Sequence, residues 1–368
     1  MLYCPAMSTL CDLLLLPFLL WLAAWRLLGD RNGWLAFLNA WAWWLLSAAL
    51  PAGMAALWRR SRLASLLWGV GVAAFWLREY GWTLPALKNR TRIRRIEQIQ
   101  TDTNPENPEN PCPNSSFSLS LLTFNLLNNQ RNLTPLLALV ARETPDVLLF
   151  QECIPSHAAQ LERGLAACYP HRLWLPAPEY GMGFGIASRL PFALTGFWQY
   201  PGFEPFATRV TIALPHPTIS SSLLDLYCVQ FISPTNEVRR VGPTALLRLR
   251  ERQIDWVLAE IDRRQRPALV VGDWNTTEGS DAYRRVTAQL VDGWREAGNG
   301  PGWSWPRRLN PLVNSAALPV LRLDYALHTS RRFAPALAVA EMRVIQDALG
   351  SDHCPLLARV EMEEVRLF

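Results

Sequence analysis

Carboxylate and amide side chains stand at the ends of several short apolar runs of this chain. In "ALVVGDWN", Asp273 and Asn275 directly follow a run of hydrophobic residues. Five further polar residues border similar runs: Asn125, Glu152, Asp324, Asp352 and His353. Turn formation explains one such residue, but an unpaired carboxylate is costly to bury. Together, the seven residues predict a shared site at the ends of separate strands.

The residue types indicate which chemistry this site performs. Carboxylate and amide oxygens suit a hard cation such as Mg²⁺ or Mn²⁺, whereas zinc prefers cysteine and histidine. The C-terminal part of the chain has an odd number of cysteines and no CxxC motif: Cys112, Cys153, Cys168, Cys228 and Cys354. This pattern disfavours zinc and a disulfide framework, and it leaves a single disulfide open. A metal, a held water molecule and hydrogen-bond donors are the groups that phosphoryl transfer requires.

Residues 117–368 have the alternating pattern of a mixed α/β domain. Short apolar runs predict strands at 117–125, 146–152, 183–192, 209–215, 225–233, 267–275, 321–328 and 354–362. Amphipathic segments predict helices at 133–145, at 243–264 and from about Ser280. About 250 residues of interleaved strands and helices can form a two-sheet core covered by helices. We therefore expect the ends of the strands to position the polar residues.

Six short motifs follow one another in the order "TFN", "FQE", "GFGIASRLP", "GDWN", "RLDY" and "SDH". Over roughly residues 117–362, this series resembles the endonuclease/exonuclease/phosphatase family, in which "GDWN" is usually GDFN. The family includes pancreatic deoxyribonuclease, abasic-site endonucleases, sphingomyelinases and inositol-phosphate 5-phosphatases. The resemblance implies an α/β fold in four layers, a two-sheet β-sandwich flanked by helices, with the site at one end. It also implies a metal-dependent phosphoesterase.

The resemblance assigns a role to each matching residue. It implies that Glu152 binds Mg²⁺ (or Mn²⁺), assisted by Asn125 and by Asp352. Asp273 would orient or deprotonate the attacking water, and Asn275 would hold this water and a phosphate oxygen. His353, fixed by Asp324, would contact the phosphate in the transition state.

One position departs from the family pattern. "DLYCVQFISP" has Gln230 where the family usually has histidine or tyrosine at the end of a strand. Glutamine can donate a hydrogen bond to a phosphoryl oxygen, but it is neither a cation nor a proton donor. A catalytically weakened relative that binds phosphorylated ligands or lipids is therefore the alternative to an enzyme. The water-holding pair Asp273 and Asn275 favours the enzyme, because a binding protein has no need of it.

The first part of the chain has a membrane-like composition. Ten of the 17 tryptophans precede residue 83, and apolar runs cover roughly residues 10–28, 34–58 and 63–77. About 20 apolar residues cross a bilayer, so we expect residues 1–87 to be an anchor of about three transmembrane helices. The early Asp12 and the lack of basic residues before it argue against a cleaved signal peptide.

A basic and proline-rich segment, residues 88–116, separates this anchor from the domain at 117–368. Repeated Asn-Pro pairs in "TDTNPENPENPCPNSS" predict a stiff spacer. Basic residues in short loops mark the cytoplasmic side of a membrane protein, and here they give two answers. Arg59, Arg60 and Arg62 indicate that the domain lies outside the cytoplasm, whereas the basic residues at 88–95 indicate that it lies inside. We expect a multi-pass membrane protein with an extracytoplasmic catalytic domain.

The remaining motifs and the charge have ordinary explanations. "GMGFG" at residues 181–185 predicts a turn into a strand, since no helix follows it. His157, His171, His216 and His328 lack metal-ligand spacing and are predicted to be surface or turn residues. The net charge of +5 permits phosphate-rich partners, but no basic run is interleaved with aromatic residues. The substrate therefore stays open among nucleic acid, a phospholipid head group and a small phosphodiester.

Overall fold

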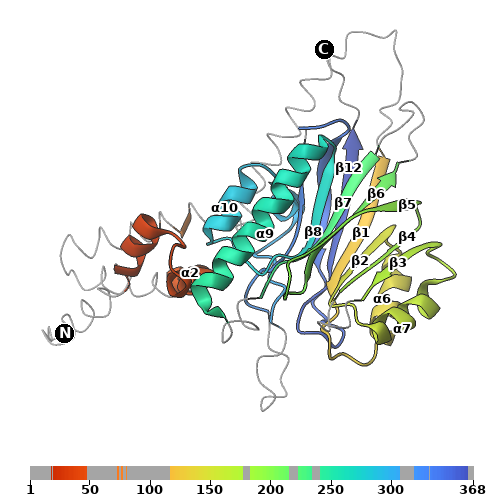
Figure 1. Ribbon diagram of the computed structural model, residues 1–368, viewed down its shortest axis with the longest axis horizontal. Helices are drawn as coiled ribbons and strands as arrows, with labels where there is room; N and C mark the ends of the chain where they lie inside the picture. The colour runs from red at the N-terminus through yellow and green to blue at the C-terminus, as the bar shows by residue number, and fades with distance from the viewer. Residues whose placement is uncertain are drawn as a thin grey trace, which may run out of the picture.

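The structure is a computed structural model that describes residues 18, 20–47, 73, 76–77, 80, 117–176, 183–214, 223–233, 241–306, 319–330 and 332–363. Two six-stranded sheets pack face to face at its centre (Figure 1). The first sheet has the order β11-β12-β1-β2-β4-β3, and the second has the order β5-β6-β7-β8-β10-β9.

The strands of the first sheet are β1 (Phe117–Asn125), β2 (Val147–Gln151), β3 (His171–Leu175), β4 (Phe184–Ser188), β11 (Ala336–Val344) and β12 (Leu356–Glu363). Those of the second sheet are β5 (Phe192–Gln199), β6 (Pro205–Ala213), β7 (Leu223–Gln230), β8 (Ala268–Asp273), β9 (Val291–Asp292) and β10 (Asp324–His328). Each sheet is mixed, because β1 and β2 are parallel in the first and β7 and β8 are parallel in the second.

The alternation of side chains along each strand divides the hydrophobic core into layers. In β2, Val147 and Leu149 face the second sheet, whereas Leu148 and Phe150 belong to a cluster on the opposite face. Successive side chains of a strand point to opposite faces, so a continuous apolar run is buried on both sides. The fully buried strands therefore require a cover on their outer faces.

Helices provide this cover. The outer face of the first sheet packs against α6 (Thr134–Glu143) and α7 (Pro155–Leu165). The second sheet packs against α9 (Pro243–Arg264) and α10 (Asp281–Thr287) (Figure 1). The short helix α11 (Gly293–Ala297) lies beside β10 and β11. Proline in the first turn starts three of these helices, and the Ser280 hydroxyl caps α10. The predicted four-layer sandwich is confirmed.

Some elements differ from those predicted by the sequence. The segment predicted as one strand at 183–192 instead contains β4 and the start of β5, because residues 189–191 interrupt it. The sequence analysis did not predict α7, α11, β3 or β11. Two of these elements, β3 and α11, are only five residues long, and the apolar face of α7 is formed by only a few residues, Ala158, Leu161 and Leu165.

The N-terminal segment, residues 20–47, folds against the domain that contains the two sheets. It contains α2 (Gly33–Ala40), whose first turn is capped by the Asn32 side chain. Asp30 and Asp281 exchange hydrogen bonds, each backbone N–H donating to the other carboxylate at 2.6 Å. The Gly33 N–H donates to the Thr244 hydroxyl at 3.2 Å, which ties α2 to the start of α9.

In the part of the chain that the structure describes, no helix is both long enough and apolar enough to cross a membrane. The described part of the apolar run 34–58 is broken, because α2 ends before Trp41 and helical residues resume at 42–47. The rest of this run, most of the run 63–77 and the predicted spacer at 88–116 lie outside the described residues.

Candidate active site

The strand order brings the predicted site residues to one end of the sandwich. Asn125 ends β1, and Glu152 follows the parallel neighbour β2. In the second sheet, Gln230 ends β7 opposite Asp273 at the end of β8. The antiparallel strand β10 starts at this end, where Asp324 pairs with Asp273. His353 lies just before β12, which runs antiparallel to β1 and so starts beside its end.

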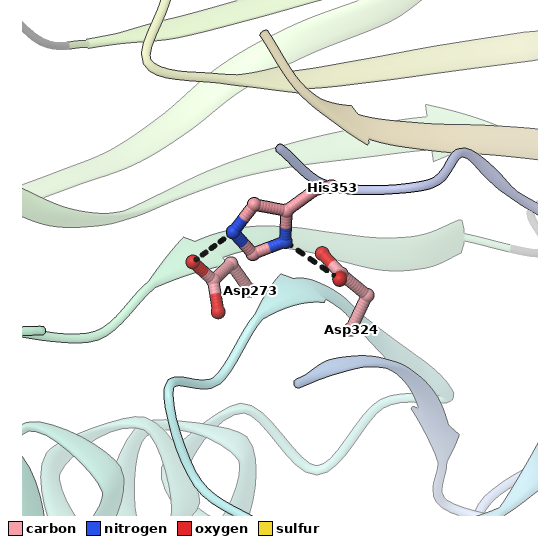
Figure 2. Close-up of side chains that lie close together, drawn as sticks. All are labelled: Asp273, Asp324 and His353. Carbon is pink, nitrogen blue, oxygen red and sulfur yellow. Dashed lines mark hydrogen bonds and ion pairs between the residues drawn. The ribbon is translucent and has the colours of Figure 1, made fainter. Parts of the chain in front are cut away.

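His353 lies between two buried carboxylates. Its Nδ1 is 2.8 Å from Asp324 Oδ2, and its Nε2 is 3.7 Å from Asp273 Oδ2 (Figure 2). All three side chains are at most 5% exposed. The predicted fixing of His353 by Asp324 is therefore present in the geometry, and Asp273 lies on the other side of the ring.

Burial and charge shift the pKa values of this group in opposite senses. Burial raises the pKa of Asp273 to about 7, an effect that the Asp324 carboxylate increases and the His353 ring opposes. Burial alone would lower the pKa of His353, but the carboxylates of Asp324 and Asp273 outweigh it and raise this pKa to about 10. Near neutral pH the Asp273 carboxylate can therefore accept a proton, whereas the His353 ring stays protonated and positively charged.

Neutral amides hold the Glu152 carboxylate. Its Oε1 accepts hydrogen bonds from Asn125 Nδ2 and Gln230 Nε2, both at 3.0 Å, and its Oε2 accepts one from the Asn128 N–H at 2.9 Å. Asn125 Oδ1 accepts from the Leu127 N–H, so this amide orients Glu152 through its nitrogen. Gln230 therefore belongs to the site, where it contacts Glu152.

Asn275 orients the Asp273 carboxylate. Its backbone N–H donates to Asp273 Oδ1 at 2.9 Å, and its Nδ2 donates to Asp273 Oδ2 at 3.0 Å and to the Phe231 carbonyl at 2.8 Å. Both amide hydrogens are thereby used within the protein. Asn275 therefore controls the direction of the Asp273 oxygens, and its contact with water or a phosphate oxygen stays a prediction.

Backbone strain marks the same two places. Glu152 and Asn275 have positive φ angles of 55° and 46°, which residues with a side chain adopt at a cost. At Gly272, a Cβ would lie 2.2 Å from the Val229 carbonyl oxygen, so only glycine lets β8 approach β7 closely here. This close approach sets Asp273 beside Gln230.

Two buried polar residues of α9, which the sequence analysis did not single out, hold the strand ends. Arg250 donates a hydrogen bond to the carbonyl of Asn275, and Gln253 accepts one from the Ile232 N–H at 2.9 Å. Both lie on the inner face of α9 among apolar residues at helical spacing. A charged residue inside an apolar face is the signal that could have identified Arg250.

Replacing Arg250 with methionine should therefore lower kcat by about ten- to hundredfold, because the Asn275 peptide would shift and Asp273 with it. The free energy of unfolding should change little, since a hydrogen bond is lost but the burial of a cation is also removed. Steady-state kinetics and chemical denaturation measure the two quantities. Arg248→Met, on the exposed side of α9, is the matched control, and an equal kcat in both variants would contradict the assigned role.

The prediction that His157 and His328 lie at the surface or in turns is wrong. His157 is fully buried, with Nε2 at 2.8 Å from the Gln130 carbonyl and Nδ1 at 3.2 Å from the Glu152 carbonyl. It thus supports the strained Glu152 backbone from α7. His328 is also fully buried and pairs with Glu296 at 2.8 Å, whereas His216 lies outside the described residues.

The segment 303–306 contacts the site from the other side. Trp305 Nε1 donates to Asp352 Oδ2 at 3.1 Å, and its ring lies 6.4 Å from that of His353. The Ser304 hydroxyl accepts the Asp324 N–H at 3.2 Å. Ser351 donates to the Asn125 carbonyl at 2.8 Å, so the "SDH" serine joins the two strand ends.

The donor set suits a divalent cation at Glu152. Three of the roughly four acceptor positions of its carboxylate are filled by neutral donors, so one stays open and the charge is not balanced by a cation among the described residues. Asp273, Asp324 and His353 also lie within metal-ligand distance of one another. Because His353 holds its proton between the two carboxylates, this group is better described as an ion-pair cluster. Cys153, Cys228 and Cys354 are buried free thiols, so the oxygen ligands fit Mg²⁺ or Mn²⁺.

Comparison with known proteins assigns the family. A profile described as the endonuclease/exonuclease/phosphatase family matches residues 122–353. The chain belongs to this family. Family membership makes it a metal-dependent hydrolase of the phosphoesterase and nuclease class, in agreement with the catalytic arrangement at the sheet ends. A search of curated proteins finds no match.

Solved structures of the family share its fold. The AP endonuclease LMAP from Leishmania major is 17% identical, with a TM-score of 0.53, over 72% of this chain and 91% of that chain. D. rerio TDP2, complexed with a single-strand DNA product, is 20% identical, with a TM-score of 0.50, over 66% and 98% of the two chains. A family protein from Bacteroides thetaiotaomicron is 14% identical, with a TM-score of 0.50, over 67% and 99%. At these identities the likeness shows the fold alone.

The contact between Gln230 and Glu152 leads to a prediction about metal affinity. Gln230→Ala should raise the Mg²⁺ concentration for half-maximal activity by about 10- to 100-fold, because the carboxylate loses a group that orients it. Excess Mg²⁺ should restore most of kcat. Gln199→Ala is the control, since Gln199 ends β5 and donates to the Phe203 carbonyl at 2.9 Å. Equal Mg²⁺ dependence in the two variants would show that Gln230 does not orient Glu152.

Proposed function

We propose that this protein is a membrane-anchored, Mg²⁺-dependent phosphoesterase that hydrolyses its substrate by in-line attack of water. The observation that carries the proposal is the placement of a carboxylate held by neutral amides at the same sheet ends as the Asp273–His353–Asp324 group. One carboxylate can hold a cation while the other accepts a proton. The two tasks of metal-assisted hydrolysis are thus divided between two carboxylates.

Each residue has a defined part in this reaction. Glu152, with Asp352 nearby in the fold, would hold the metal, which supplies charge neutralisation at the phosphoryl group. Asp273, with its pKa of about 7, accepts the proton of the attacking water, and Asn275 fixes the direction of its oxygens. His353 donates a hydrogen bond to a phosphoryl oxygen, and Asp324 keeps this ring charged.

An open cleft of about 730 Å³ adjoins the site at Asp352. It is lined by Leu127, Asn129, Gln130, Arg131, Asn132, Pro135, Asp347, Leu349, Gly350 and Asp352. The lining combines three amides, one arginine and two aspartates with two leucines, a proline and a glycine, so its composition does not select between nucleic acid and a phospholipid head group. Solved structures of the same fold include TDP2 with a single-strand DNA product and an AP endonuclease, which supports nucleic acid as the first substrate class.

The membrane anchor rests on the apolar runs and on the surface of the N-terminal segment. Leu27, Trp34 and Phe37 are 77%, 68% and 54% exposed, and large exposed apolar patches favour contact with lipid or another apolar surface. We place the catalytic domain outside the cytoplasm. Protease added to intact spheroplasts should then cut the 101–116 spacer, whereas cutting only after lysis would place the domain inside.

The full chain in detergent tests the activity. With Mg²⁺, it should hydrolyse at least one of single-stranded DNA, sphingomyelin, inositol phosphates and bis(p-nitrophenyl) phosphate. A chelator should abolish the hydrolysis, and added Mg²⁺ should restore it. Failure on every substrate, or activity that the chelator leaves intact, would refute the proposal.

A further inference from the structure

The strip of residues 303–306 joins the site to the outside of the domain. Its inner side contacts the site through the bonds from Trp305 to Asp352 and from the Asp324 N–H to Ser304. Its backbone pairs with the segment before β10, since Trp305 and Leu321 exchange hydrogen bonds at 2.9 and 2.7 Å. The Cys354 N–H donates to the Ser304 carbonyl at 2.8 Å, next to His353. The position of this strip is therefore coupled to three site residues.

The N-terminal segment contacts the outer side of the same strip. The Trp44 ring stacks on Trp303 at 4.8 Å with an interplanar angle of 27°, and Trp43 meets Trp303 edge-on at 4.8 Å. Trp44 Nε1 also donates to the Val320 carbonyl at 2.7 Å. Val320 in turn donates its N–H to the Trp305 carbonyl at 3.0 Å. Trp44 thus contacts both segments of the hydrogen-bonded pair that carries Trp305, and Trp43 contacts one of them.

Polar contacts fix the N-terminal segment against the domain. Asn39, fully buried, donates to Asp30 at 2.7 Å and accepts from Trp21 Nε1 at 3.1 Å. Asp30 exchanges its backbone hydrogen bonds with Asp281. At Gly279, a Cβ would lie 2.5 Å from the Asn39 carbonyl oxygen, so the two parts approach at backbone distance. These directional contacts define one docking position.

We propose that the N-terminal segment is part of the catalytic unit, in which Trp43 and Trp44 hold Trp303 and thereby fix Trp305 beside Asp352. Trp43 and Trp44 are positioning residues, since they touch no reacting atom. The partner of this surface is the chain's own N-terminal segment. The inference rests on the proposed function, because it assumes that the orientation of the Asp352 side chain affects metal binding. It also predicts that residues 20–47 cannot be removed without a loss of metal affinity.

Full-length variants in detergent test this coupling. Trp44→Ala and Trp303→Ala should each raise the Mg²⁺ concentration for half-maximal cleavage of bis(p-nitrophenyl) phosphate, by about three- to thirtyfold. Mg²⁺ binding measured by calorimetry should weaken by the same factor, while KM at saturating Mg²⁺ stays unchanged. The double variant should add little to either single one, because both remove the same contact. Trp44→Phe retains the stacking and should recover part of the affinity.

Trp34→Ala is the matched control, because Trp34 belongs to the same segment and is 68% exposed. Its Mg²⁺ dependence should equal that of the parent chain. Parent-like Mg²⁺ binding in Trp44→Ala and Trp303→Ala would overturn the inference and leave the proposed function standing. A parent chain that binds Mg²⁺ but cleaves none of the substrates would overturn the proposed function, while weaker binding in these variants would still support the coupling. A parent chain that neither binds Mg²⁺ nor cleaves would overturn both.

Discussion

Asp273→Asn should lower kcat by about 10²- to 10⁴-fold, the range for the loss of a general base. The amide keeps the shape of the carboxylate and can still meet Asn275, but it cannot accept the proton of the attacking water. KM should change much less, since the substitution removes a proton acceptor and leaves the size of the side chain unchanged. Steady-state kinetics of the full chain at saturating Mg²⁺ measure both constants.

The same substitution should change the pH profile. In the parent chain, the pKa of Asp273 is raised to about 7. The rate should therefore rise with pH through this value, because Asp273 acts as a base only after it has lost its proton. The rate should fall again as the pH approaches about 10, where His353 loses its proton. Asp273→Asn should remove the acidic limb and move the alkaline limb to lower pH, because His353 loses one of the carboxylates that raise its pKa. Asp255→Asn, on the exposed side of α9, should leave both limbs in place, and an acidic limb that persists in Asp273→Asn would assign it to another group.

Glu152→Gln should lower kcat at fixed, low-millimolar Mg²⁺ by about a thousandfold, or roughly 4 kcal/mol of transition-state stabilisation. The substitution retains the size of the side chain and removes the one negative charge that the neighbouring amides leave unbalanced. Calorimetry should show that Mg²⁺ binding is strongly weakened. The measurement separates loss of the metal from loss of the base, because Asp273→Asn should still bind Mg²⁺.

Glu162→Gln is the matched control for this effect. Glu162 lies on the neighbouring helix α7, where its half-exposed carboxylate pairs with Arg172. Its replacement should leave Mg²⁺ binding and kcat at the parent values. Retention of Mg²⁺ binding and of activity in Glu152→Gln would place the metal elsewhere, and the group of Asp273, Asp324 and His353 would then be the next candidate.

The ends of the central strands could be predicted from sequence because two local rules agree there. Apolar runs form most of β1, β2 and β8, and a polar residue stands at the end of each run, where the strand gives way to a loop. The order of the motifs then fixed the family and, with it, the convergence of Glu152, Asp273 and His353. The site could be predicted because each of these residues lies at the end of a strand or just before one.

The residues that sequence analysis missed act from inside regular elements. Arg250 and His157 occupy helical positions that periodicity assigns to the core. Their roles appear only in the folded chain, where Arg250 contacts the Asn275 carbonyl and His157 contacts the Glu152 carbonyl. The docking of Trp44 on Trp303 joins positions more than 250 residues apart. A tryptophan-rich run has the same composition whether its rings meet lipid or one another, so composition alone could not reveal this contact.

The location of His353 also bears on how the enzyme would lose activity on heating. His353 precedes a strand of the first sheet, whereas both carboxylates that face it belong to the second. A slight slippage between the sheets would separate the ring from its partners while every strand kept its own ladder of hydrogen bonds. Inactivation should therefore begin at lower temperature than the loss of circular dichroism, and the gap between the two curves would report the mechanical rigidity of the sandwich interface.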